Sequence, residues 1–466
     1  MNLISKFTTW QGILKPSQIL GPMPTNRELY QKTFDMAWPS AVENVFIALI
    51  SAIDMIMVGS LGSEAISAVG ICTQPKFICL APIFALNTAT IVYVARRKGE
   101  KRQKEANDYT KIALIFSVII SLTFCLTSYY FSNEILTFAG ANSDYIGEAN
   151  VYIRILLLSL IPYSIGLTLT SAQRGAGFTK ISLVTNLIAN IVNIIFNYLL
   201  INGNFGFPAL GVKGAAIATA IGNVVSFLIA LYAMFRKGSY IHLNLEPIYN
   251  FVEKTKEMFG IFANAFIEQI FLRFGFFMYS KVVANLGTQE FAAHQVCINI
   301  MVITFGLGDG LQLANTSLVG QDLGAKRSDL AIVQTRITHL IGIISAIIVS
   351  ICLSIFARDL VGVFADEIEV IELAHTPMLM LAVTILLQIP QVIIVGTLRG
   401  AGDVKFVAWM MLICVGIFRP LFAWIFAYPL GLGLIGAWIG LFLDQFLRFV
   451  ISLLRFKKGI WLTISL

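Results

Sequence analysis

The 466-residue sequence is poor in charge, since Asp, Glu, Lys and Arg together make up only 13% of it. Soluble proteins carry roughly 25%, because polar and charged side chains must cover their surface. Apolar residues, counted with Tyr and Cys, instead make up 57% of the chain. This composition excludes a soluble enzyme and a disordered chain, and it predicts a polytopic membrane protein.

Cysteine is scarce, with no C-x-x-C pair and no histidine at metal-ligand spacing. We therefore expect small residues of the core or of the lipid-facing surface, which excludes a disulfide scaffold. A cleavable signal peptide is not expected, because the first 33 residues contain no apolar run ending in small residues. The cysteines are Cys72, Cys79, Cys125, Cys297, Cys352 and Cys414.

Long apolar runs dominate what is present. An α-helical membrane span needs about 20 mostly apolar residues. The expected fold class is therefore an all-α polytopic membrane protein with twelve transmembrane helices. The predicted spans are 35–59, 66–95, 111–131, 150–172, 181–202, 212–235, 260–284, 291–319, 331–356, 372–397, 405–427 and 434–454.

Basic residues are nearly absent from every second connection. The connections after the odd-numbered spans contain a single basic residue, Arg358, whereas those after the even-numbered spans contain clusters such as Arg96, Arg97 and Lys98. By the positive-inside rule both termini are cytoplasmic, and we expect a multi-pass protein of a bacterial-type inner (plasma) membrane. The net charge of +7 therefore reports topology and predicts no nucleic-acid partner.

The two halves of the sequence repeat at an offset of 225 residues: residues 61–64 match 286–289, and residues 174–177 match 399–402. Six spans separate the copies, so both have the same orientation, and such parallel repeats rock around a central site. Pro247 and mixed charges favour a linker with an amphipathic helix between the halves. The expected parts are a cytoplasmic N-terminal segment (1–33), a six-helix lobe (34–235), a cytoplasmic linker (236–259), a second six-helix lobe (260–458) and a tail (459–466).

Charged residues inside the spans are functional candidates, because placing a charged side chain at the centre of a membrane helix costs ~2.5–3.5 kcal/mol on insertion scales. Glu43 and Asp54 in span 1 are spaced to share one helix face. In span 5 a stripe of four asparagines lines one face. The pattern predicts a cation site where Asp54 supplies charge and the stripe supplies amide oxygens; the alternative is interhelical hydrogen bonding. The stripe consists of Asn186, Asn190, Asn193 and Asn197.

Other charged residues lie in later spans. Asp309 in span 8 sits between two glycines, where backbone can approach an ion or a neighbouring helix. Lys76 in span 2 could neutralise an acid when a cation is absent. The last two spans contain three charged residues, for which we expect a packing pair and an arginine that snorkels toward the membrane surface. They are Arg419 in span 11 and Asp444 and Arg448 in span 12.

Several motifs, taken in order, resemble the multidrug and toxic compound extrusion (MATE) family over about residues 33–458. The most specific is N-I-I-F-N-Y at 193–198, followed by G-F-P-A-L-G and G-A-A-I-A-T. The complete set is Asp54 with V-G-S-L-G (58–62), Q-R-G-A-G (173–177), 193–198, 206–211, 214–219, A-A-H-Q (292–295), L-V-G-Q (318–321) and L-R-G-A-G-D (398–403).

The resemblance implies two six-helix lobes in a V around a central cavity. It implies a secondary active antiporter, not an enzyme, which exports organic, often cationic drugs in exchange for Na⁺ or H⁺ by a rocker-switch mechanism. The expected partners are small-molecule drugs and the lipid bilayer, with no cofactor besides the coupling ion, and the expected state is a monomer.

The resemblance also assigns residues. Asp54 lies where the family keeps its span-1 acid, and Glu268 resembles the span-7 acid of the sodium-coupled branch. The coupling candidates are Asp54, Glu268, Asn190, Asn193, Asn197 and Asp309, with Asp54, Asn193 and Asn197 as ligands if the ion is Na⁺. Candidates for the substrate cavity are Glu43, Phe274, Tyr279 and Gln388, since aromatic faces attract organic cations.

The chain departs from the family pattern at two positions. Some members have an aspartate at the place of Asn197, and others have an acid in span 10 near Gln388. Both residues are amides here, which argues against a two-acid site in the first lobe and against a span-10 acid.

Three other classes of membrane protein share part of this pattern. A major-facilitator drug antiporter also has twelve spans and a parallel repeat, but its span-2 loop typically reads G-x-x-x-D-R-x-G-R-R, whereas residues 95–100 read A-R-R-K-G-E. A lipid-linked oligosaccharide flippase of the same superfamily usually has more spans and a basic cavity. An intramembrane enzyme would need a constellation such as Gly-x-Ser-x-Gly or His-Glu-x-x-His, and neither occurs.

Overall fold

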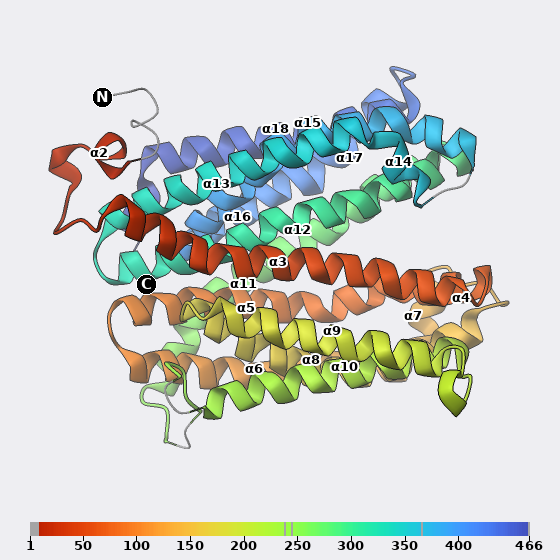
Figure 1. The fold of residues 1–466 in the computed structure, drawn as a ribbon, viewed down its shortest axis with the longest axis horizontal. Helices are drawn as coiled ribbons and strands as arrows, with labels where there is room; N and C mark the ends of the chain where they lie inside the picture. The colour runs from red at the N-terminus through yellow and green to blue at the C-terminus, as the bar shows by residue number, and fades with distance from the viewer. Residues whose placement is uncertain (1–8, 237–238, 244–245, 365–366, 465–466) are drawn as a thin grey trace. The chain divides into compact units, whose positions relative to one another are not determined.

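The computed structural model describes residues 9–236, 239–243, 246–364 and 367–464. Within these ranges all regular structure is helical (Figure 1). The helices are α2 (Trp10–Ile13), η1 (Pro16–Gln18), α3 (Asn26–Gly59), α4 (Ser63–Ile71), α5 (Thr73–Gly99), α6 (Gln103–Tyr130), α7 (Ser132–Phe138), α8 (Ile146–Gly175), α9 (Thr179–Leu200), η2 (Asn204–Gly206), α10 (Gly211–Phe235), α11 (Phe251–Ala284), α12 (Thr288–Gly324), α13 (Ser328–Ile355), α14 (Ala357–Gly362), α15 (Ile368–Gly400), α16 (Val404–Met411), η3 (Leu412–Phe418), α17 (Arg419–Ala427), α18 (Gly433–Lys458) and η4 (Ile460–Thr463).

The described residues contain 12 helical segments that are long and apolar enough to cross a membrane, which confirms the predicted fold class. The second segment, Glu64–Gly99, combines α4 and α5, and the eleventh, Val404–Ala427, combines α16, the π-helix η3 and α17. Such interruptions of a helix do not change the mean hydropathy of the segment, so they cannot be predicted from apolar runs in the sequence.

Several helices begin earlier than the sequence windows predict, by eight residues in α6, which begins at Gln103, and by nine in α3 and α11. α3 begins at Asn26 rather than at residue 35, and α11 begins at Phe251 rather than at residue 260. Charged residues such as Glu253 and Lys254 end an apolar window but not a helix, because both types are good helix formers. The helix expected within the linker is therefore the first part of α11.

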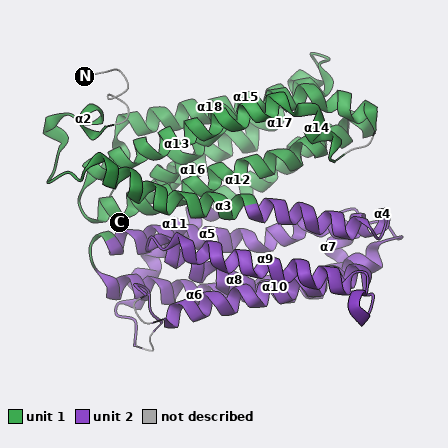
Figure 2. Cartoon of the chain, in the orientation of Figure 1, with its two compact units in different colours: residues 1–45, 99–101, 267–466 green, residues 46–98, 102–266 purple. Residues whose placement is uncertain are grey.

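The chain forms two compact units (Figure 2). Unit 1 comprises residues 1–45, 99–101 and 267–466, and unit 2 comprises residues 46–98 and 102–266. The division falls inside α3 and α11, so each of these helices contributes one end to each unit. The lobe boundaries at the connecting loops remain a prediction.

In unit 1 a pair of glycines lets α15 pack closely on α12. A Cβ atom at Gly396 would lie 2.6 Å from the carbonyl oxygen of Gln312, and one at Gly400 would lie 2.4 Å from that of Thr316. The two glycines are four residues apart, in the small-xxx-small spacing that brings membrane helices into backbone contact. The sequence reading did not single out this motif.

Gly396→Ala is therefore expected to lower the thermal unfolding temperature in detergent. Alanine favours a helix over glycine by about 0.8–1 kcal/mol, but overpacking against Gln312 costs about 1–3 kcal/mol. Gly260→Ala on α11 is the matched control, because no atom lies within 4 Å of the added methyl group. The control should unfold at an equal or higher temperature than the parent; equal shifts in both variants would contradict the packing argument.

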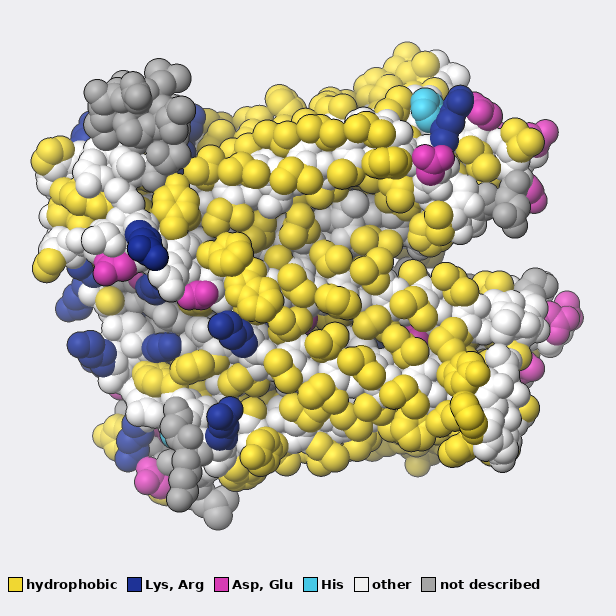
Figure 3. All heavy atoms as spheres, viewed as in Figure 1, with side chains coloured by type: hydrophobic (Ala, Val, Ile, Leu, Met, Phe, Trp, Pro, Cys, Tyr) yellow, Lys and Arg dark blue, Asp and Glu magenta, His cyan; other side chains and the backbone are white. Residues whose placement is uncertain are grey.

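The surface reflects the membrane setting. Hydrophobic side chains cover the helix flanks, and Lys and Arg gather at one end of the helices, on the left of Figure 3. All six cysteines are free thiols, five of them buried and Cys352 exposed on α13. This distribution matches the expected core and lipid-facing positions.

Candidate functional site

The asparagine stripe of α9 is turned toward the interior of unit 2. Asn193 and Asn197 are buried, whereas Ile191 and Ile195 are exposed. The 3.6-residue period of the helix separates these two faces, so the local sequence pattern alone places the amides inside. Asn186 is also buried, and Asn190 is half-buried.

Asp54 of α3 contacts this stripe at Asn197. Asn197 Nδ2 donates a hydrogen bond to Asp54 Oδ1 over 2.7 Å and another to Asn193 Oδ1 over 3.4 Å. Asn193 Nδ2 donates to Thr219 Oγ1 of α10 over 3.4 Å. The structure thus brings together three of the predicted coupling residues, and Asn190 has no hydrogen bond to them in the described chain.

Residues that the sequence reading missed complete this cluster. Tyr152 of α8 and Thr219 are hydrogen-bonded to each other, and the Thr219 hydroxyl also donates to the carbonyl oxygen of Ala215 over 3.0 Å. Thr219 belongs to the G-A-A-I-A-T motif, which was quoted for resemblance and not for chemistry. Tyr152 carried no signal, since a lone tyrosine in a span is common at helix contacts.

Lys76 of α5 supplies the positive charge opposite Asp54, with which it interacts electrostatically. The neutralising role suggested for Lys76 by the sequence remains a prediction. An acid and a base at membrane depth compensate each other's cost of burial.

One oxygen of the cluster has no donor. Asn197 Oδ1 is buried and accepts no hydrogen bond from the described residues. Leaving a buried acceptor unsatisfied costs about 1–3 kcal/mol, and a cation or a donor group would remove this cost. Carboxylate, amide and hydroxyl oxygens are the ligands that hard cations prefer.

No group of three or more His, Cys, Asp or Glu side chains able to hold a metal ion occurs in the described part of the chain. Asp54 is thus the only carboxylate in the cluster of residues just described. The oxygen set with one negative charge suits a monovalent cation better than a divalent metal, whose sites usually contain several carboxylates.

Glu268 lies in unit 1 and is already paired. It is buried on α11 and forms an ion pair with Arg399 at the end of α15. Asp309 on α12 also interacts electrostatically with Arg399. The sequence reading had placed Arg399 in a basic connection, but α15 extends to Gly400 and carries its side chain into this pair.

The glycines around Asp309 allow neighbouring helices to approach. A Cβ atom at Gly310 would lie 2.4 Å from Ala41 Cα of α3, and one at Gly308 would lie 3.2 Å from Gln388 Oε1 of α15. Asp309 itself is exposed. The glycines next to Asp309 therefore let neighbouring helices approach α12, which is one of the two roles expected from the sequence; the other is backbone approach to an ion.

The four candidates for the substrate cavity lie in different surroundings. Phe274 is exposed and lines an open groove on unit 1. Glu43, Tyr279 and Gln388 are 1%, 1% and 2% exposed, respectively. In this structure they are core residues, because neighbouring helices cover them, and a cavity-lining role would require a rearrangement.

The buried charges of α17 and α18 form a network rather than a pair with a snorkelling arginine. Asp444 is fully buried and accepts hydrogen bonds from Arg419 Nη2 over 2.7 Å and Arg448 Nη2 over 2.9 Å. Arg448 is only 6% exposed, so the prediction that an arginine snorkels is wrong for this residue. The ion pair with Asp444 holds the Arg448 guanidinium inside the helix packing.

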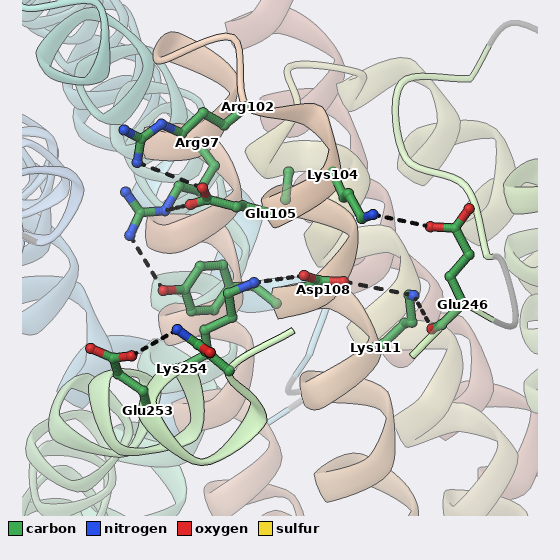
Figure 4. A network of polar contacts seen from close by, with 12 residues as sticks. Arg97, Arg102, Lys104, Glu105, Asp108, Lys111, Glu246, Glu253 and Lys254 are labelled. Carbon is green, nitrogen blue, oxygen red and sulfur yellow. Dashed lines mark hydrogen bonds and ion pairs between the residues drawn. The ribbon is translucent and has the colours of Figure 1, made fainter. Parts of the chain in front are cut away.

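A second charged network fixes the connection between the halves to α6 of unit 2 (Figure 4). Lys254 Nζ of α11 lies 2.6 Å from Asp108 Oδ2, and Lys111 Nζ lies 3.7 Å from Asp108 Oδ1. Glu246 of the connection lies 3.6 Å from Lys104 and accepts from Lys111 through its carbonyl oxygen over 2.9 Å. Asp108 is nearly buried and holds two lysines at once.

Asp108→Asn is expected to make the connection about tenfold more sensitive to trypsin at Lys254 and Lys256. The lost charge removes hydrogen bonds to a charged group, worth about 1.5–3 kcal/mol, and protease sensitivity follows the population of the locally open form. Glu134→Gln on the exposed surface of α7 is the control. Equal cleavage rates in the parent and in Asp108→Asn would show that the network does not hold the connection.

Comparison with known proteins identifies the family. The MatE family model matches residues 39–199 and 265–425, once in each half, in agreement with the internal repeat. The chain is 27% identical to the uncharacterized transporter YisQ of Bacillus subtilis, covering 97% of this chain and 98% of that protein. It is 24% identical to a probable multidrug resistance protein NorM of Thermotoga maritima, covering 93% of both chains.

Solved structures show the same fold. A transporter of the MOP superfamily from Pyrococcus furiosus matches with a TM-score of 0.87 at 21% identity, covering 94% of this chain and 97% of that one. An outward-facing multidrug resistance MATE family transporter matches with a TM-score of 0.86 at 21% identity, covering 93% and 96%. The major-facilitator alternative is excluded, and the chain belongs to the MatE family of multi-pass membrane transporters, which are not enzymes.

Proposed function

We propose that this transporter exports organic, often cationic drugs in exchange for Na⁺ or H⁺. Relatives along nearly the whole chain are described as multidrug resistance proteins, which supports a drug as the exported solute. The parallel repeat supports alternating access by a rocker switch. The basic connections support cytoplasmic termini in a bacterial-type inner membrane, and we propose a monomer as the working unit.

The observation that carries the coupling proposal is the contact of Asp54 with the amide stripe. A carboxylate at membrane depth is hydrogen-bonded by Asn197, faces Lys76, and lies beside an amide oxygen without a donor. Ionisable residues in membrane spans commonly mark ion pathways. We assign Asp54 as the coupling acid, with Asn193 and Asn197 as further ligands if the ion is Na⁺.

Competition at Asp54 gives the cluster two states. When no cation is bound, the positive charge of Lys76 compensates the negative charge of Asp54. When a cation binds, it neutralises Asp54, and the positive charge of Lys76 is then uncompensated. The surroundings of Lys76 must then change, which couples occupancy of the site to the packing of α3 and α5. A cation can shift a conformational equilibrium only if it binds the two states with different affinity.

Glu268 and Asp309 are less suited to be the primary site in the observed state. The ion pair with Arg399 occupies Glu268, so a cation would have to displace a guanidinium before it could bind. The two carboxylates of Glu268 and Asp309 share a single arginine, Arg399, so the group carries an excess negative charge. This charge favours the binding of a cationic drug. We propose that this group influences drug binding and that Asp54 binds the coupling ion.

The test is ethidium uptake into inverted membrane vesicles under a sodium gradient and under a proton gradient, each imposed separately. The proposal expects at least one gradient to drive ethidium movement above the rate in vesicles without the transporter. A collapsed gradient with the same total ion concentration is the control. Ethidium movement that is independent of both gradients would contradict coupled antiport.

A further inference from the structure

An open groove runs along the flank of unit 1 between α11 and the helices η3 and α17. Its volume is about 670 Å³. Most of its walls are apolar and aromatic, and it is separate from the Asp54 cluster, which lies in unit 2. The lining residues are Phe274, Met278, Lys281, Val282, Asn285, Gly416, Ile417, Pro420, Leu421, Trp424 and Tyr428.

The local sequence explains why the groove exists. Pro420 cannot donate a backbone hydrogen bond and its ring clashes with the carbonyl group four residues earlier, which is that of Gly416. The preceding turn is the π-helix η3, a wider form that appears where the regular ladder is interrupted. Gly416 has no side chain there, and a Cβ atom would meet nothing closer than 3.7 Å, so the floor of the groove stays open.

The length of the groove matches one leaflet of a bilayer. The lining residues of this segment run from Phe274 on α11 to Asn285, which directly follows the helix end at Ala284, and at 1.5 Å per residue they span about 16 Å along the helix axis. Half of a ~30 Å hydrocarbon core is close to that length. An acyl chain lying along the groove would thus reach from the bilayer surface to its midplane.

The polar groups of the groove gather at one end. Lys281 is exposed and has no carboxylate partner in the described chain. Asn285 directly follows the end of α11, and the Tyr428 hydroxyl donates to the carbonyl oxygen of Val282 over 3.0 Å. A phenol with an ordinary pKa of about 10 is neutral at physiological pH, so Tyr428 acts as a donor. One ammonium above an apolar floor is complementary to a phosphate with an acyl chain.

We propose that this groove binds an anionic phospholipid, with one acyl chain against Phe274, Leu421 and Trp424 and the phosphate at Lys281. Asn285 and Tyr428 directly follow the ends of α11 and α17, so the headgroup belongs to the leaflet on the side of the connections 285–287 and 428–432. An exported organic cation does not fit the same end, because Lys281 repels it. This site is independent of the assignment of Asp54.

The test titrates the full-length, delipidated protein in detergent with dioleoylphosphatidylglycerol or dioleoylphosphatidylcholine and counts bound lipids by native mass spectrometry. The parent should bind one phosphatidylglycerol about fivefold more tightly than phosphatidylcholine, from the attraction of one basic residue at a lipid surface. Lys281→Gln should remove this preference and leave phosphatidylcholine binding unchanged. Lys213→Gln, an exposed lysine at the start of α10, should keep the preference.

A second variant tests the apolar part. Gly416→Leu places a side chain in the groove without a backbone clash, and it should weaken the binding of both lipids. Equal binding of the two lipids by the parent, or a preference that survives Lys281→Gln, would overturn the proposal. Displacement of the bound lipid by ethidium would also overturn it, because the groove would then be a drug site.

Discussion

Asp54→Asn abolishes cation-driven ethidium efflux in our account while the protein still folds and inserts. Asparagine keeps the shape of the side chain and can still meet Asn197, but it removes the negative charge. Hydrogen bonds and contacts to a charged group contribute about 1.5–3 kcal/mol, so the cation affinity should fall by about 10- to 100-fold. The measurement is ethidium uptake into inverted vesicles, which corresponds to efflux from the cell, at matched transporter amounts.

The control for this variant is Asp144→Asn, which removes an exposed acid from the connection between α7 and α8. Its efflux should equal that of the parent. Lys76→Gln should behave differently from both, because it leaves Asp54 without its compensating charge and should tighten cation binding while slowing turnover. Efflux by Asp54→Asn at the parental rate under either gradient would show that another group couples the ion.

The largest expected loss of stability comes from Asp444→Asn. The change leaves Arg419 and Arg448 buried next to each other, where their shared partner had been. Removing one member of a buried ionic group costs about 3–5 kcal/mol, because the remaining charge is uncompensated. We expect a markedly lower unfolding temperature in detergent, followed by intrinsic fluorescence or by aggregation on heating.

Two controls separate burial from pairing. Glu372→Gln breaks the exposed pair with Arg358, whose side chains are 57% and 61% exposed, and such pairs contribute about 0–1 kcal/mol. Replacing all three residues at once, Arg419→Met, Asp444→Leu and Arg448→Met, should recover much of the stability, as apolar replacements of buried ionic groups often do. A parental unfolding temperature for Asp444→Asn would contradict the burial argument.

The sequence was sufficient for the fold class because its signals are long and redundant. Each membrane span depends on about 20 apolar residues, and the repeat at 225 residues adds register. Helix ends were predicted less well. The start of α11 at Phe251 lies in a charged stretch, where helix formation depends on contacts such as Lys254 with Asp108, and those contacts are not visible in a hydropathy window.

The candidate site was predictable only where one helix carried the whole pattern. The asparagines of α9 form a stripe by spacing alone, and the structure brings Asn197 to Asp54 and links Asn193 to Asn197. Thr219 and Tyr152 come from two other helices, so no spacing within one segment connects them. Arg399 was read as a topology signal because it follows an apolar run, yet α15 continues past it and places it at Glu268.

The most direct test of the account counts both fluxes in the same proteoliposomes. Ethidium loaded on one side should drive Na⁺ or H⁺ in the opposite direction through the parent, with a fixed ratio of cation to ethidium that does not change with the size of the gradient. Asp54→Asn should show no cation countermovement. A parent that moves ethidium without any cation, or an Asp54→Asn variant with the parental ratio, would contradict the claim that this carboxylate exchanges its cation for the exported drug.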